Sequence, residues 1–208
     1  MSVLSNLIAR MTGDVGAKQY ADGATNVEVQ LTRQGAIMVA DAAGKYASSA
    51  LAGRLFYACN QTAIATTAAL TTTYTGFAMG NPSTSGKNAI ILEAGFSQAS
   101  SADTNGLVGL MVGEIGTTTI AADVTAYNCK MGGASAVCKI DNGTTIGTPV
   151  LARVIGSYKE DSQIVGPPRI YDVGGSIILV PGWFVAFYTT LATEACFQFH
   201  MIWEEIPV

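Results

Sequence analysis

The sequence predicts an all-β protein, an antiparallel β-sandwich with an N-terminal arm. Short apolar runs with period-two alternation recur along the chain, and this spacing sends apolar side chains to one face of a sheet. Gly, Asn, Asp and Thr residues separate the runs, as turn formers do between strands. Because no long helical pattern separates them, an α/β fold is excluded and two packed antiparallel sheets follow. The 208 residues suffice for one sizeable domain.

Residues 1–26 form the predicted arm, and residues 27–208 form the predicted sandwich. Met1–Met11 has apolar residues at helical spacing, whereas Thr12–Gly16 and Tyr20–Asn26 are rich in turn formers. Such an arm either reaches onto a neighbouring subunit or is a frayed terminus. The start of the chain lacks a long apolar core, so we expect no secretion signal.

The expected strands share apolar and β-branched residues bounded by turn formers. They are Val27–Leu31, Ala36–Ala40, Leu55–Asn60, Tyr74–Gly80, Asn88–Ser97, Gly106–Ile115, Ala126–Met131, Ala136–Ile140, Pro149–Ser157, Arg169–Val180, Trp183–Thr190 and Ala195–Ile206. Two other segments differ from them. We expect a helical turn or two within Asp41–Leu51, and an edge strand or a covering loop within the threonine-rich Gln61–Thr75.

The C-terminal third carries the clearest signal. Pro181 and Gly182 stand between two β-rich runs, where proline fixes φ and glycine accepts a positive φ, so we expect a hairpin-like turn. In the last strand one face presents Phe197, Phe199, Met201 and Trp203, and the other presents Cys196, Gln198, His200 and Glu204. We therefore expect this strand to be central to the core.

Composition indicates a protein whose surface is covered by partners. Hydrophobic residues make up 49% and charged residues 12%, against a usual charged share of about 25%. The alternative is a monomer that uses Ser, Thr, Asn and Gln on its surface. A net charge of −4 without a basic cluster argues against binding nucleic acid. The longest apolar runs fall short of the roughly 20 residues that span a bilayer, so we expect no membrane segment.

Patterns for enzymatic chemistry are weak, and we predict no catalytic residue, cofactor or metal. Gly80–Asn88 differs from a phosphate-binding loop in spacing and lacks the hydroxyl after its lysine, so a turn between strands is expected. His200, the one histidine, lies in a strand and no Gly-x-Ser-x-Gly motif occurs, so it should face solvent or an interface. Glu204 and Glu205 are adjacent in a strand and should point to opposite faces.

The four cysteines lack the spacing of a zinc site. If the residues between Cys129 and Cys138 form a hairpin with a four-residue loop, these two cysteines lie opposite each other, within reach of a disulfide. The alternative is two reduced thiols acting as small apolar groups. We expect Cys59 and Cys196 to be buried and unpaired.

Two phrases, Met79–Leu92 and Ile178–Trp183, together with the strands around them, resemble minor structural proteins of tailed phages, notably head decoration or cement proteins. The resemblance covers the chain from about Phe77 to its end. It implies a jelly-roll sandwich that forms a homotrimer on the outside of an icosahedral shell and contacts the major capsid protein. It also implies a place on the virion surface after synthesis in the host cytoplasm, and it brings no catalytic residues.

A different class of function is kept as the alternative. A sandwich that binds a receptor or glycan, as in phage fibres or tails, would gather exposed aromatic and acidic side chains in one concave patch, with Trp183, Tyr171 and Tyr158 as candidates. A hydrolase would need a cleft with two facing carboxylates. The leading hypothesis is a non-enzymatic structural subunit without a small-molecule substrate, for which many weak contacts on a lattice suffice.

Overall fold

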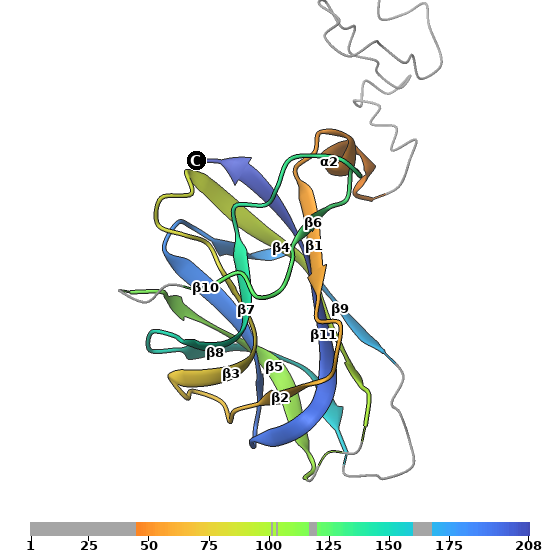
Figure 1. Ribbon diagram of the computed structural model, residues 1–208, viewed down its shortest axis with the longest axis vertical. Coiled ribbons are helices and arrows are strands. Elements are labelled where there is room, and N and C mark those ends of the chain that lie inside the picture. The colour runs from red at the N-terminus through yellow and green to blue at the C-terminus, as the bar shows by residue number, and fades with distance from the viewer. Residues whose placement is uncertain (1–44, 101, 103, 117–119, 160–167) are drawn as a thin grey trace, which may run out of the picture. The chain divides into compact units, whose positions relative to one another are not determined.

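A computed structural model of the chain (Figure 1) describes residues 45–208 except 101, 103, 117–119 and 160–167. Within this part, Tyr46–Val208 forms one compact unit. The predicted arm at 1–26 and the predicted strands Val27–Leu31 and Ala36–Ala40 lie outside the described residues.

Eleven strands in two antiparallel sheets make up nearly all the regular structure of the described residues, which confirms the all-β sandwich. The six-stranded sheet contains, in spatial order, β6 (Tyr127–Asn128), β1 (Leu55–Cys59), β11 (Thr193–Pro207), β4 (Lys87–Gln98) and β9 (Arg169–Leu179), with β2 (Ile64–Thr66) also paired to β11. The five-stranded sheet contains β7 (Lys139–Thr145), β3 (Thr73–Gly80), β10 (Trp183–Thr189), β5 (Gly106–Glu114) and β8 (Val150–Tyr158). The jelly-roll topology that the resemblance implies stays a prediction.

One short helix and one short strand lie within the two segments for which the sequence predicted them. The described part of Asp41–Leu51 contains the single-turn helix α2 (Ala47–Leu51). Of the two alternatives for Gln61–Thr75, the edge strand is correct for β2. No helix in the described ranges has the length and apolar character needed to cross a membrane.

Most consecutive strands lie in different sheets; the exceptions are the β1–β2 and β7–β8 connections. The turn at Pro181–Gly182 shows this. The N–H of Trp183 donates to the carbonyl of Val180 (3.2 Å) and Gly182 has a φ of +90°, as its residues predict. However, the turn leads from β9 to β10, which belong to different sheets, so the prediction of a hairpin-like turn is wrong.

Asn81 holds this end of the sandwich together. Its side chain is fully buried, and its Nδ2 donates to the carbonyl oxygens of Lys87 (2.8 Å) and Leu179 (2.9 Å). Its own carbonyl oxygen accepts from the N–H of Gly182 at 2.8 Å. One asparagine thus joins the β3–β4 turn to the β9–β10 turn, because each buried backbone group needs a partner.

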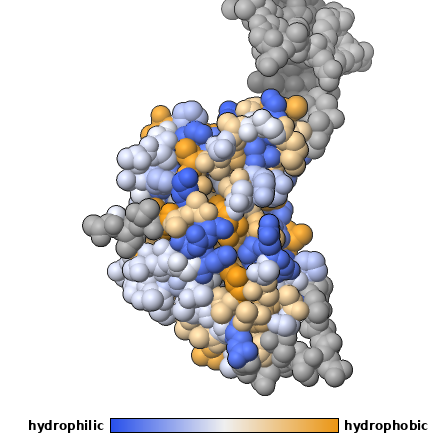
Figure 2. All heavy atoms as spheres, in the orientation of Figure 1, coloured by the Kyte–Doolittle hydropathy of each residue, from blue (hydrophilic) through white to orange (hydrophobic). Residues whose placement is uncertain are grey.

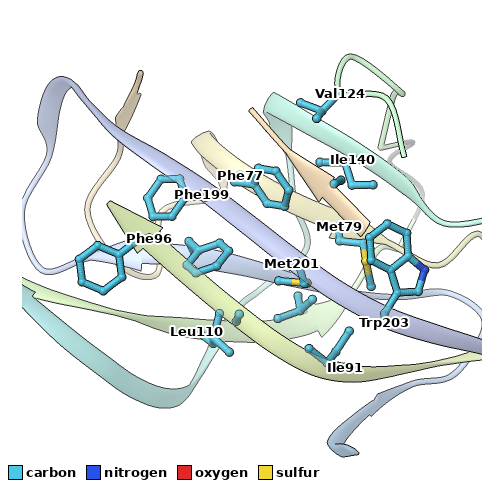
Figure 3. Packing of buried hydrophobic residues seen from close by; sticks show 14 of the residues in the cluster. Phe77, Met79, Ile91, Phe96, Leu110, Val124, Ile140, Phe199, Met201 and Trp203 are labelled. Atoms are coloured by element: carbon cyan, nitrogen blue, oxygen red, sulfur yellow. The ribbon is translucent and has the colours of Figure 1, made fainter. Parts of the chain in front are cut away.

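The core lies between the sheets and is dominated by β11 (Figure 3). The predicted row of Phe197, Phe199, Met201 and Trp203 is fully buried. Phe199 stacks on Phe187 of the opposite sheet with ring centroids 4.5 Å apart. Full burial of such a side chain is worth about 1.5–3 kcal/mol. Because β11 pairs with β1, β2 and β4, the prediction that this strand is central is confirmed.

A second apolar cluster lies on the other face of the five-stranded sheet. Val185 and Phe187 of β10 point to the main core, whereas Phe184, Ala186 and Tyr188 belong to the second cluster. Loop residues also belong to this cluster and include Ile115, Ile120 and Ile146. β10 is therefore buried on both faces, which explains its unbroken apolar sequence.

Asp141, Asn142 and Gly143 are residues typical of a tight turn, but they lie inside β7. The local turn chemistry is still visible, because Asp141 Oδ1 accepts from the N–H of Gly143 at 2.8 Å. Pairing with β3 prevails, and the register is irregular between Thr75 and Ala78, which lie opposite Gly143 and Asp141.

We expect Phe199→Ala to lower the free energy of unfolding by about 3–5 kcal/mol, because it opens a cavity where the two sheets meet. Gln198→Ala, on the other face of the same strand, should cost at most about 1 kcal/mol. Urea denaturation of both variants measures the difference. Equal losses would contradict the assignment of the buried face.

Candidate functional site

The segment between Cys129 and Cys138 connects the two sheets and does not form the predicted hairpin. β6, before it, pairs with β1, and β7, after it, pairs with β3. The N–H of Cys129 donates to the carbonyl of Leu55 at 2.9 Å, whereas Cys138 is buried in the main core. Both thiols are free in the structure. The proposed cross-strand opposition fails because each flanking strand pairs with a different neighbour.

Glu205 holds this connecting segment against the last strand. Its side chain is fully buried, and its Oε1 accepts from the N–H groups of Val137 (2.9 Å) and Cys138 (3.0 Å). The Lys87 ammonium lies 3.1 Å from Oε2, and the Trp203 indole N–H donates to Oε1 at 3.3 Å. A buried carboxylate is tolerated when its oxygens are satisfied in this way.

Sequence reasoning placed Glu205 on a face but missed its role. Glu204 points outward and pairs with Arg54 at 3.1 Å, so the prediction of opposite faces is correct. The alternation of side chains along the strand could have revealed this role, because it puts Glu205 on the same apolar face as Met201 and Trp203. A charged residue on a buried stripe indicates a satisfied polar cluster.

The cysteines differ in exposure and in acidity. Burial raises the pKa of the Cys138 thiol, and the Glu205 carboxylate beside it raises the pKa further. Cys138 is thus a protonated core residue, unsuited to act as a nucleophile. Cys196 is buried as predicted, but Cys59 is exposed, which corrects the prediction that it is buried. The reason is that Cys59 ends β1 on the outer face of its sheet.

His200 lies on the outer face of the six-stranded sheet with its Nε2 3.2 Å from Glu93 Oε1. Gly95 leaves room for the ring, because a Cβ there would lie 2.1 Å from the His200 Cε1. Cys59 is the cross-strand neighbour of His200, but its Sγ donates to the Asn60 carbonyl at 3.4 Å. The geometry does not assemble a cysteine–histidine pair.

One side of the sandwich exposes apolar side chains along two edge strands, and we call it the β8–β9 edge. β8 pairs only with β5 and β9 pairs only with β4 among the described strands. The exposed apolar residues of this edge are Val150 (56%), Leu151 (54%), Val154 (54%), Ile170 (64%) and Ile178 (54%). Arg153 Nη1 donates to the Tyr171 hydroxyl at 2.9 Å and so joins the two strands across the edge. Elsewhere, on the face shown in Figure 2, apolar residues lie in separate groups among hydrophilic ones.

The aromatic residues proposed for glycan binding are not gathered in one patch. Tyr158 is buried, with its ring centroid 5.2 Å from that of Phe197. Tyr171 lies at the β8–β9 edge, and Trp183 opens β10 beside Glu114. The prediction that these three could form one concave surface is therefore wrong.

A polar hollow of about 350 Å³ lies instead where the end of β1 meets β6 and β7, and we call it the Tyr127 hollow. It is lined by Cys59, Asn60, Gln61, Thr62, Asp123, Val124, Thr125, Tyr127 and Asn142. Sequence reasoning missed it because its walls come from three segments far apart in the chain.

Comparisons of the chain with family models, curated proteins and solved structures find no match.

We expect Glu205→Ala to destabilise the fold by about 3–5 kcal/mol, because it leaves the Lys87 ammonium, an indole N–H and two backbone N–H groups without their acceptor. Glu204→Ala is the matched control and removes only a surface pair worth about 0–1 kcal/mol. Guanidinium denaturation measures both. If Glu205→Ala lowers the free energy of unfolding as little as Glu204→Ala does, the contacts of Glu205 contribute little to stability.

The raised pKa of Cys138 predicts a loss of stability at alkaline pH. Above the ordinary thiol pKa of 9.0 the unfolded chain loses a proton that the folded protein keeps, so the free energy of unfolding falls as pH rises. Cys138→Ala should flatten this fall between about pH 9 and pH 10, below the range where buried Tyr74 acts in the same direction.

Cys59→Ala is the control for that measurement, because Cys59 is exposed and partial burial raises the pKa of its thiol less than burial beside Glu205 raises that of Cys138. Urea midpoints of the parent and both variants across this range give the slopes. Identical slopes for the parent and Cys138→Ala would refute the assignment.

Proposed function

We propose that this chain is a non-enzymatic structural subunit that assembles with copies of itself through the β8–β9 edge. The role we propose is the one that the sequence resemblance implies: a decoration or cement subunit of a phage head, jelly-roll in topology. It would form a homotrimer on the virion surface and contact the major capsid protein there.

The observation that carries the proposal is the set of exposed apolar residues on the β8–β9 edge. Five large aliphatic side chains on two neighbouring edge strands are each more than half exposed. A sheet edge also presents N–H and C=O groups that another strand can pair with. Exposed apolar residues on an open edge favour association, because burial removes the apolar surface from water and pairing satisfies the backbone.

The symmetry of the oligomer determines which surface of a second subunit the β8–β9 edge contacts. A patch that binds its own copy gives a dimer, whereas a trimer needs two different complementary surfaces on each subunit. In the proposed trimer the β8–β9 edge of one subunit contacts another surface of the next. Attachment to a shell then gains from avidity, since three subunits bind together.

The low charge of the chain supports this assignment. Charged residues are 12% of the sequence, so few ions must lose water when surfaces become buried. Arg153 on the β8–β9 edge is already bonded to Tyr171, which reduces the cost of covering it.

The test is a charge placed on the β8–β9 edge. We expect Leu151→Asp to raise the concentration at which the trimer dissociates at least about tenfold, because burying an unpaired carboxylate is unfavourable. Leu191→Asp is the matched control, since Leu191 is similarly exposed (50%) but lies in the β10–β11 turn. Sedimentation velocity of the full chain measures the oligomer, and circular dichroism verifies folding.

Co-sedimentation with assembled phage shells tests the second half of the proposal. The parent and Leu191→Asp should attach to shells, and Leu151→Asp should attach weakly. A parent chain that stays monomeric at tens of micromolar and does not attach to shells would overturn the assignment.

A further inference from the structure

We propose that the Tyr127 hollow is a carbohydrate-binding site that takes a sugar residue. This inference concerns a different surface from the β8–β9 edge and does not depend on assembly. It differs also from the aromatic trio of the sequence analysis, none of which lines this hollow.

The first wall of the hollow is held rigidly by Asn60. This side chain is buried, its Nδ2 donates to the carbonyl oxygens of Thr62 and Phe197, and its Oδ1 accepts from the N–H of Phe199. The turn after β1 is thereby fixed to the central strand β11. Gln61 and Thr62 follow Asn60 and are exposed at the rim.

The second wall is positioned by Val124. Its N–H donates to the carbonyl of Ile140 at 3.1 Å, and its side chain is buried in the main core. Because side chains alternate in extended backbone, Asp123 and Thr125 on either side of it are presented outward, and both are exposed. The carboxylate and the hydroxyl thus face the hollow from a segment that is bonded to β7.

Tyr127 supplies an aromatic surface. The residue is 49% exposed, and its ring stacks on that of Tyr57 with centroids 5.7 Å apart and an angle of 27° between the planes. Tyr57 therefore supports the ring and leaves the remainder open. An exposed aromatic ring held in this way suits the apolar C–H face of a sugar, and its hydroxyl is a polar handle.

Asn142 completes the site from β7. Its side-chain oxygen is buried and has no hydrogen-bond partner among the described residues. This oxygen is closed off from solvent, so Asn142 forms part of the wall of the hollow and offers no direct contact to a ligand there. A sugar hydroxyl can donate to the exposed Asp123 carboxylate while accepting from other groups of the rim.

The chemistry of the lining selects the ligand class. The residues of the hollow include an acid but no lysine or arginine, which disfavours anions such as phosphate. The described residues hold no cluster of three metal-ligating side chains, so a metal ion is not the occupant that we favour. Hydroxyl, amide and carboxylate groups around one exposed ring fit a neutral polyol, and the volume is in the range of small-molecule sites.

The experiment applies the full chain to a microarray of bacterial and animal oligosaccharides, together with a panel of free monosaccharides. The oligosaccharide that binds most tightly on the array is then titrated into the protein by calorimetry. We expect Tyr127→Ala and Asp123→Asn each to raise its Kd at least about tenfold, which is the loss of one good contact. Glu194→Gln, at an exposed acid outside the hollow, is the matched control and should bind like the parent.

Cys59 provides a second readout, because its thiol is exposed and lines the hollow. Bound oligosaccharide should slow alkylation of Cys59 by iodoacetamide several-fold while the rate at Cys129 stays the same.

A parent chain that binds neither the array nor the monosaccharides would overturn the proposal. So would binding that survives both hollow substitutions, or Cys59 alkylation that the bound sugar leaves unchanged. Thermal melts establish that each variant is folded.

Discussion

Burial of alternate side chains of β11 is the constraint on which both sheets depend. This strand pairs with β4 along most of its length, with β1 from His200 to Glu204 and with β2 at its beginning. Its aromatic row packs against β3 and β10 of the opposite sheet through Phe77 and Phe187. A one-residue slip of β11 would move Phe197 and Trp203 to the solvent side, so the register of the six-stranded sheet is strongly specified. The outer loops and the edges are built on this fixed centre.

A charge sits on that same buried row, and its neighbours explain why it is tolerated. Glu205 accepts hydrogen bonds from the segment that links the two sheets and from Trp203, and Lys87 balances its charge. The linking segment has little regular structure of its own, so these bonds replace the ladder that a strand would provide. The cost of burying the carboxylate is offset only while every partner stays in place.

Much of the fold followed from local patterns. Period-two alternation located the core row of β11, and the residues of Gly80–Asn88 and Pro181–Gly182 marked real turns. The predictions that failed depended on which strand each segment pairs with. Asp141–Gly143 has turn chemistry yet lies in a strand because β3 pairs with it, and Cys129 and Cys138 are separated by strands that pair with different neighbours.

The candidate sites were less predictable than the fold for the same physical reason. Alternation shows which face a residue occupies, but not which distant residue lies beside it. The Tyr127 hollow joins the end of β1, the approach to β6 and the middle of β7, and nothing in the spacing of Asp123 and Asn142 reveals that they share it. The β8–β9 edge was equally hidden, because its strands looked like any other apolar run until their places at the sheet margins were known.

The order in which the strands occur along the chain has a consequence for biosynthesis. β1 and β4 lie on either side of β11, which follows them by about a hundred residues or more. On the ribosome, both must wait with their apolar faces uncovered until residues 193–207 emerge. Loop closure over such separations is slow, so the nascent chain is open to chaperones and to non-native association for most of its synthesis. Any product that stops short of this strand lacks the centre of its larger sheet, so we expect proteases to degrade it.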